Sequence, residues 1–297
     1  MIRRSILLLV ILSACRIWAQ SLSSNSVHTL AYGPHPRQVL DIWPADTDTP
    51  SPVALYAHGG GFHAGDKSAV QRMSLIRLLH ADGITIASMN YRFIEHAPLA
   101  DILREGSRAV QFLRAEAQTW NLDPGRIAMI GTSAGAGIAL WTAFQEDMAD
   151  PSHQNPVRHH SSRLQCAVAI NPQAGFDPLT WIRVMGLPPN GVLPSFRKYL
   201  DGYPQTLDAL LLNPNVPTLS LLDLISADDP PVFLMNTYRD RAPRNTGDYQ
   251  HHPNHVHALA ARCRERGLLH SVSLREDEDH HASRIRAFLR EHLLSAP

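Results

Sequence analysis

The apolar residues of this chain are concentrated in short continuous runs, separated by longer stretches of mixed character. Strands are predicted over residues 53–57, 85–90, 127–130, 167–170, 232–236 and 271–275. Most of these segments are rich in Val, Ile, Ala and Leu, which is typical of strands buried on both faces. Helices are predicted over 69–81, 101–119, 134–146, 255–266 and 282–294. This alternation predicts βαβ units and a mostly parallel sheet flanked by helices.

The pattern breaks down between residues 171 and 229. Eight prolines punctuate this stretch, and apolar patches recur between them, for example at 210–212 and 219–224. A structureless loop of this length would be unusual in a compact domain. We therefore expect a cap-like insertion of short helices over a site at the carboxyl ends of the strands. A mobile surface segment is the alternative.

The first residues have the pattern of a targeting segment. Arg3 and Arg4 precede an apolar run over 6–12, which is too short to span a membrane. We expect a signal peptide over 1–19 and a single α/β domain over 20–297. Residues 12–15 also resemble a lipobox, which would leave a lipidated Cys15 as a membrane anchor. Cleavage near residue 19 and lipidation at Cys15 both predict an exported protein, whether periplasmic, extracellular or lipid-anchored. The alternative to both is a buried N-terminal strand or helix.

Composition excludes some partners. Of 297 residues, 44% are hydrophobic, and 27 basic side chains balance 27 acidic ones. A net charge of zero argues against a nucleic acid held by bulk electrostatics. The 17 histidines include the pairs 159–160 and 251–252, which lack a matching set of carboxylates and cysteines, so solvated loops are favoured over a metal site. Cys166 falls in a predicted strand and is expected to be core, although a disulfide to Cys263 is possible in an oxidising compartment.

The strongest chemical signal is Gly131-Thr132-Ser133-Ala134-Gly135. An apolar run precedes this Gly-x-Ser-x-Gly motif and a predicted helix follows it. That order of strand, tight turn and helix exposes a nucleophilic serine. We therefore interpret Ser133 as a nucleophile.

A second motif, His58-Gly59-Gly60-Gly61-Phe62, follows the predicted strand 53–57. Glycines placed after a strand let the backbone approach a ligand closely, and their N–H groups can bind an oxyanion. We predict an oxyanion hole formed by the backbone N–H groups of Gly60, Gly61 and Ala134.

With both motifs in this order, the chain resembles the α/β-hydrolases of the hormone-sensitive-lipase type and of the acetyl-xylan and feruloyl esterase (BD-FAE-like) type. The resemblance runs from about residue 39 to 294. It is carried by the two motifs and by residues 40–44, 65–67, 90–92, 101, 109–114, 123–127 and 229–234. It implies the α/β-hydrolase fold and a serine carboxylesterase that needs no cofactor and no metal.

The resemblance also implies an acid and a base, in the chain order serine, acid, histidine. Asp240 falls at the family's acid position after strand 232–236, although the preceding His-Gly of the family is absent; Asp248 is the rival. His280 follows strand 271–275 at the expected offset, in an acidic run that replaces the family's glycines; His281 is the rival. The expected catalytic set is Ser133, Asp240 and His280.

The expected function is hydrolysis of a carboxylic ester through an acyl-enzyme, with a small-molecule or glycan ester as substrate, including acetylated or feruloylated glycans. A peptidase or arylformamidase of the same fold is one alternative, because the motif does not distinguish esters from amides. A catalytically silent binding protein is the other.

Overall fold

The structure, a computed structural model, describes residues 27–186, 219–275 and 278–294. The predicted signal peptide, including Cys15, lies outside these ranges. None of the helices within them is long and apolar enough to cross a membrane.

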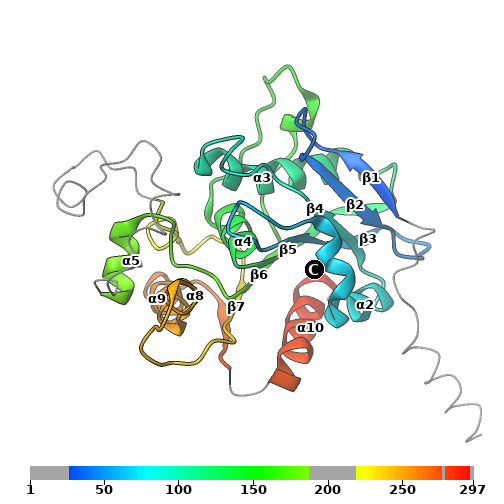
Figure 1. Ribbon diagram of the computed structural model, residues 1–297. Helices are drawn as coiled ribbons and strands as arrows, with labels where there is room; N and C mark the ends of the chain where they lie inside the picture. The colour runs from blue at the N-terminus through cyan, green and yellow to red at the C-terminus, as the bar shows by residue number, and fades with distance from the viewer. Residues whose placement is uncertain (1–26, 187–218, 276–277, 295–297) are drawn as a thin grey trace, which may run out of the picture.

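Within the described ranges, one twisted sheet of eight strands forms the centre of the molecule (Figure 1). The strands lie in the order β1-β2-β4-β3-β5-β6-β7-β8. β1 and β2 pair antiparallel, β2 pairs antiparallel with β4, and the others are parallel. The strands are β1 (His28–Ala31), β2 (Val39–Trp43), β3 (Ser51–Ala57), β4 (Thr85–Met89), β5 (Leu122–Thr132), β6 (Cys166–Ile170), β7 (Val232–Met235) and β8 (His270–Ser273). All six predicted strands are present.

The helices connect these strands and cover both faces of the sheet. They are η2 (Lys67–Arg72), α2 (Ser74–Ala81), α3 (Leu99–Ala115), α4 (Ala134–Phe144), η3 (Pro156–His159), α5 (Pro178–Met185), α8 (Thr246–Gln250), α9 (Pro253–Arg266) and α10 (Glu278–Leu294). The five predicted helices correspond to η2 with α2, and to α3, α4, α9 and α10. The predicted α/β architecture is therefore confirmed.

Alternation along the strands divides the apolar residues into two cores, one on each face of the sheet. On β3, Val53 and Leu55 belong to the core that α3, α4 and α9 cover, whereas Ala54 and Tyr56 belong to the core that α2 and α10 cover. Every residue of β3 is buried. This double burial explains why the strands appear in the sequence as continuous apolar runs.

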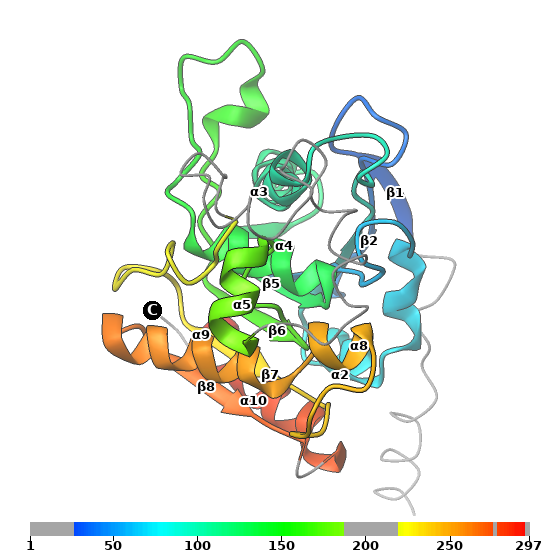
Figure 2. The ribbon, with the colours of Figure 1, turned by 60° about the vertical axis from the view of Figure 1, so that its left-hand side comes forward.

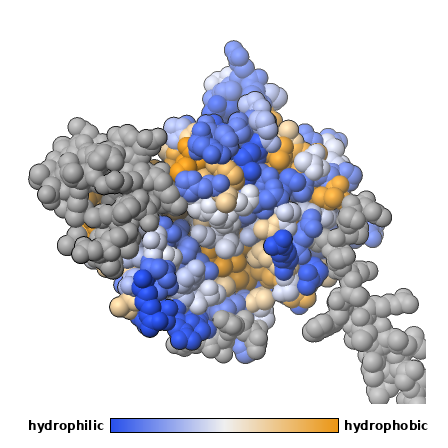
Figure 3. All heavy atoms as spheres, viewed as in Figure 1, coloured by the Kyte–Doolittle hydropathy of each residue, from blue (hydrophilic) through white to orange (hydrophobic). Residues whose placement is uncertain are grey.

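The parallel arrangement brings the carboxyl ends of β3 to β8 to one edge of the sheet, where α/β folds bind ligands. Figure 2 shows α5, α8 and α9 grouped beside this part of the sheet. The loop between α4 and β6 (145–165) projects from the molecule in both ribbon views, and Figure 3 shows that its surface is hydrophilic.

The region predicted as a cap-like insertion is described only at its two ends, since 187–218 lie outside the described residues. Its first part forms α5, which begins after the capping residue Asp177. The buried Trp181 of α5 packs against Tyr249 and His255, with ring centroids 6.0 and 5.7 Å apart. This end of the segment is therefore packed against α8 and α9.

Candidate active site

Ser133 lies in the sharp turn between β5 and α4. Its φ and ψ of 54° and −116° are unusual for a residue with a side chain, and its N–H donates to the Ile170 carbonyl at 2.8 Å. The turn requires glycine on both sides. A Cβ on Gly131 would lie 2.0 Å from the Gly135 oxygen, and one on Gly135 would lie 2.1 Å from the Ala57 oxygen. This is the geometry of a nucleophile elbow.

The glycine run after β3 lies directly against this elbow. A Cβ on Gly59 would lie 3.1 Å from the Thr132 carbonyl oxygen and 3.4 Å from the Ser133 Cβ. Gly60 and Gly61 both have positive φ, 126° and 60°, which side chains disfavour. The predicted proximity of the two motifs is therefore present in the structure.

Two aromatic residues hold the glycine run in place. Tyr91 stacks on the His58 ring and donates its hydroxyl to the His58 carbonyl at 2.7 Å. Phe62, at the other end of the run, is fully buried and meets Phe176 edge to face at 5.3 Å. The backbone between them is thus fixed before any ligand arrives.

The histidine beside Ser133 is His251, whose Nε2 lies 3.2 Å from the serine Oγ. His251 occupies the turn between α8 and α9. Its backbone carbonyl accepts a hydrogen bond from Asn236 Nδ2 at 2.9 Å, which ties this turn to the end of β7. Tyr238 packs beside the imidazole ring, with centroids 5.1 Å apart. The predicted interpretation of 251–252 as solvated loop residues is wrong for both: His251 is only partly exposed and His252 is buried.

This contact brings His251, and not the predicted base His280, within hydrogen-bond distance of Ser133. His280 lies exposed in the first turn of α10, and its rival His281 is buried, with Nδ1 bonded to Ser273 Oγ at 2.9 Å. The physical reason is that α10 begins soon after β8, so both histidines lie in the first turn of this helix. The histidine that contacts Ser133 comes earlier in the chain, in the turn between α8 and α9.

The predicted acid Asp240 contacts His252 and not His251. Its side chain is 73% exposed and lies 3.6 Å from Nε2 of His252, the neighbour of the imidazole that meets Ser133. The rival Asp248 lies in the first turn of α8 and pairs with Arg241 at 3.5 Å. The residues after β7 therefore place both carboxylates near the surface.

Nδ1 of His251 meets a carbonyl and an amide where the family has a carboxylate. It lies 3.1 Å from the Asn171 carbonyl oxygen and 2.9 Å from Gln173 Nε2, and that amide also donates to the Gln250 carbonyl at 3.1 Å. A carbonyl can only accept, so the Asn171 contact favours the tautomer with the proton on Nδ1, whereas the Gln173 amide N–H can only donate and favours a lone pair on that atom. In the tautomer with the proton on Nδ1, Nε2 is free to accept the Ser133 hydroxyl proton.

Burial lowers the pKa of His251 below its usual value, and the hydrogen bond to the Asn171 carbonyl only partly offsets this effect. The neighbouring His255 is fully buried between the Ala174 N–H and the Tyr249 carbonyl, and burial lowers its pKa to about 3. Both imidazoles are therefore neutral at neutral pH, as a general base must be.

One signal in the sequence could have located His251. α9 precedes the parallel strand β8, so its first residues must lie at the same sheet edge as Ser133. Pro253 is a preferred residue for the first helical position, and it marks where that helix begins. The position of Pro253 therefore predicts that His251 and His252, directly before it, lie near the nucleophile.

The structure shows no metal centre or disulfide among the residues it describes. No group of three or more His, Cys, Asp or Glu side chains gathers there in a way that could hold a metal ion. Cys166 and Cys263 are both buried and free. The possible disulfide between them is therefore not formed, and burial raises the pKa of the Cys263 thiol to about 12.

The match to known families agrees with this geometry. The family model described as BD-FAE matches residues 40–245, which include the glycine run and the elbow. The chain belongs to the BD-FAE family. The family match ends before His251.

Curated relatives of this BD-FAE protein have esterase names. It is 27% identical over 144 residues to the probable isoprenylcysteine alpha-carbonyl methylesterase ICMEL1 of Arabidopsis thaliana, covering 48% of this chain and 30% of that protein. It is 26% identical over 215 residues to the probable carboxylic ester hydrolase LipM of Mycobacterium tuberculosis, covering 71% of this chain and 47% of that protein. The chain thus spans less than half the length of either relative.

Solved structures confirm the α/β-hydrolase fold. A truncated carbohydrate esterase from gut microbiota superposes with a TM-score of 0.71 at 13% identity, covering 93% of this chain and all of the other. An acetyl ester-xyloside bifunctional hydrolase from Caldicellulosiruptor lactoaceticus gives a TM-score of 0.65 at 17% identity, covering 89% and 96% of the two chains.

Proposed function

We propose that this BD-FAE family member is a serine carboxylester hydrolase in which Ser133 is the nucleophile and His251 the general base. The Ser133–His251 contact carries this proposal. A serine hydroxyl is a weak nucleophile at neutral pH and requires a base within hydrogen-bond reach. The 3.2 Å separation satisfies that requirement. In the tautomer with the proton on Nδ1, the Nε2 lone pair accepts the hydroxyl proton.

The reaction then follows from this pair. Oγ of Ser133 attacks the ester carbonyl carbon while its proton passes to Nε2 of His251. The same proton moves to the leaving alkoxide as the C–O bond breaks, which leaves an acyl-enzyme. Water, deprotonated by His251, then attacks the acyl carbon and releases the carboxylic acid and free Ser133.

We place the oxyanion hole at the backbone N–H groups of Gly60, Gly61 and Ala134. Two observations support this location: the contact of Gly59 with the elbow, and the position of Ala134 at the start of α4. The first N–H groups of a helix have no partner within the helix, and they favour negative charge. Donors aimed at developing charge are worth about 3 to 4 kcal/mol each in acyl-transfer enzymes.

The Asn171 carbonyl and the Gln173 amide would take the orienting part of the role that a carboxylate has in related enzymes. A carbonyl fixes the tautomer of His251 but stabilises the imidazolium less than a full negative charge does. We therefore expect a slower enzyme that favours esters with good leaving groups.

For the substrate, we propose carboxylic esters of modest size, including acetyl or feruloyl esters of glycans. The family supports this choice, as do the methylesterase and carboxylic ester hydrolase names of the curated relatives. Export would bring the enzyme to such substrates. Export is tested by N-terminal sequencing and mass analysis of the secreted protein, which would show cleavage near residue 19 or a lipid on Cys15.

Labelling with a fluorophosphonate probe tests the nucleophile. The wild type should be labelled covalently and Ser133→Ala should not, while circular dichroism confirms that the variant is folded. Labelling that persists in Ser133→Ala would reject the proposal.

Four further variants test the base and the acid on p-nitrophenyl acetate. His251→Ala should lower kcat by about a thousandfold or more, because members of a catalytic unit act together. His280→Ala is the matched control on α10 and should leave kcat nearly unchanged, as should Asp240→Ala and Asp248→Ala. An inactive His280→Ala beside an active His251→Ala would restore the base first expected from the sequence.

A further inference from the structure

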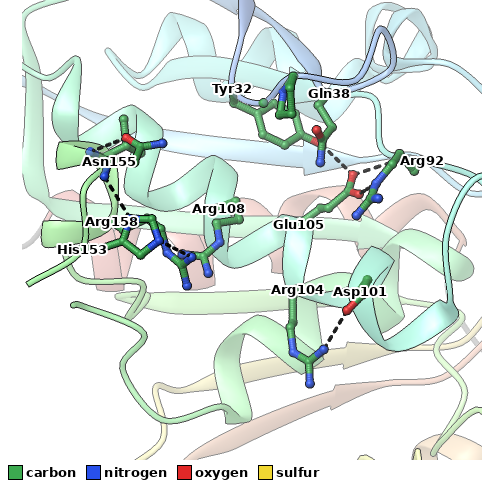
Figure 4. A pocket seen from close by; sticks show the side chains of 13 residues that line it. Tyr32, Gln38, Arg92, Asp101, Arg104, Glu105, Arg108, His153, Asn155 and Arg158 are labelled. Atoms are coloured by element: carbon green, nitrogen blue, oxygen red, sulfur yellow. Dashed lines mark hydrogen bonds and ion pairs between the residues drawn. The ribbon is translucent and has the colours of Figure 1, made fainter.

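A second cavity, separate from the Ser133 site, is lined by arginines. It has a volume of about 350 Å³ and lies between the first turns of α3, the α4–β6 loop and the turn between β1 and β2 (Figure 4). Arg92, Arg104, Arg108 and Arg158 all contribute to its wall, and we call it the arginine pocket. The proposed ester hydrolysis uses none of these residues.

Two of the four arginines have their charges matched by carboxylates. Arg92 pairs with the buried Glu105, whose side chain is 2% exposed. Arg104 pairs with Asp101 at 2.9 Å on the outer side of α3. The guanidinium groups of Arg108 and Arg158 are not part of these two pairs.

Arg108 and Arg158 have neutral partners instead. Nη1 of Arg108 donates to Gln111 Oε1 at 2.6 Å, and Nη1 of Arg158 lies 2.8 Å from His153 Nε2. Neither arginine is in a salt bridge with any residue in the described part of the chain. No acid of the pocket wall pairs with these two guanidinium groups, although the carboxylate of Asp150, outside the wall, interacts electrostatically with both.

These two charges are also close to each other. Figure 4 shows the side chains of Arg108 and Arg158 converging from α3 and from the α4–β6 loop. Burial lowers the pKa of Arg108, the nearby charges of Arg158 and Arg104 lower it further, and the Asp150 carboxylate partly offsets these effects. Nε of Arg158 is buried without a hydrogen-bond partner among the described residues. A buried donor without a partner is costly, so both the charge and the donor favour an added acceptor.

The position of Arg158 is fixed by the fold. Gln111 of α3 is fully buried and donates to the carbonyls of His160 at 2.7 Å and Met148 at 3.0 Å. These bonds tie both sides of the α4–β6 loop to the helix that carries Arg108. The two guanidinium groups are therefore held together without any ligand.

We propose that the arginine pocket binds a small organic molecule carrying a carboxylate or phosphate group. The paired guanidinium forks match the planar, bidentate geometry of such oxyanions. The volume falls within the range of small-molecule sites, and Pro34 and Val157 add apolar surface, so the ligand is larger than a bare ion. This proposal does not depend on the hydrolytic activity at Ser133.

Calorimetric titration with benzoate, phenyl phosphate and phenol tests this site. Both anions should bind saturably and more weakly at higher salt, whereas phenol, which has the same ring without the charge, should not bind. The tighter anion identifies the head group as carboxylate or phosphate. Failure of both anions to bind, or equal binding of phenol, would overturn the proposal.

Variants locate the binding. Arg108→Gln and Arg158→Gln should each weaken anion affinity about tenfold or more, because each removes a charged donor. Arg266→Gln, at an exposed arginine near the end of α9, is the matched control and should leave affinity unchanged. Folding is checked by activity on p-nitrophenyl acetate. If a Gln variant does not fold, Arg108→Lys keeps the charge but loses the fork and should still weaken binding. An equal loss in Arg266→Gln would contradict the assignment.

Discussion

Acid should destabilise this protein through His255, a fully buried imidazole in the first turn of α9. Burial lowers its pKa to about 3, compared with about 6.5 for an exposed histidine. Near pH 6, the His255 side chain therefore binds a proton in the unfolded chain but stays neutral in the folded chain. Because protons bind preferentially to the unfolded state, the free energy of unfolding must fall as the pH falls below about 6.5.

The size of this loss follows from the two pKa values. Between about pH 7.5 and pH 5, protonation of the unfolded histidine alone lowers the free energy of unfolding by about 2 kcal/mol. At pH 5 the folded imidazole is still neutral, so this figure depends little on how far below 5 its pKa lies. His251, whose pKa burial also lowers, adds to the loss in the same direction.

Urea unfolding of wild type and of His255→Gln at both pH values measures this contribution. The quantity compared is the change in free energy between the two pH values, which does not depend on how stable the variant is at pH 7.5. That change should be about 2 kcal/mol smaller in His255→Gln. His257→Gln, at an exposed histidine on the same helix, should behave like wild type. Equal pH dependence in wild type and His255→Gln would refute the reasoning.

Four further outcomes are expected. Because burial lowers the pKa of His251, the acidic decline of kcat/KM should have its midpoint below about pH 6.5, which a pH–rate profile would show. Gln173→Ala should lower kcat on p-nitrophenyl acetate about tenfold with little change in KM, since the amide positions the imidazole; an unchanged kcat would remove it from that role. Gly61→Val should lower kcat about a hundredfold or more by displacing the proposed oxyanion donors, and an unaltered rate would contradict their location. Asp82→Asn should lower the free energy of unfolding by about 1 to 3 kcal/mol in urea titrations, because Asp82 is nearly buried and joins α2 to α10 through Arg286 at 2.6 Å.

Much of the fold could be predicted from the sequence because strands buried on both faces appear as apolar runs. The run at 53–57 matches β3, whose residues are all buried. β1 and β2 were not predicted from the pattern; β1 lies at the sheet edge with a largely exposed surface, so it lacks an apolar signature. The short helix α8 was missed, and α5 was expected only as one of several short helices without bounds between 171 and 229, because each depends on packing between segments distant in sequence.

The site was predictable where its chemistry resides in contiguous residues. The elbow around Ser133 and the glycine run at 58–61 each form from one local segment, and the structure places them together. The base could not be found this way, since the distance from Ser133 to His251 depends on how α8 and α9 pack on the sheet. The Asn171 carbonyl leaves no trace in a sequence motif at all.

The turn between α8 and α9 supplies the imidazole that meets Ser133, and this changes how relatives of the protein should be sorted into active enzymes and pseudoenzymes. A search for a carboxylate after β7 and a histidine after β8 would find Asp240 and His280 in this chain and would pass over His251. The same criterion would discard a homologue that lacks those two residues but keeps the histidine of the α8–α9 turn. Under the proposed function, two positions instead distinguish active relatives from pseudoenzymes. They are a histidine shortly before the proline that begins α9 and a hydrogen-bonding residue just after β6. Under the proposed function, the end of β8 and the start of α10 have no catalytic role, so their sequences can diverge among active relatives.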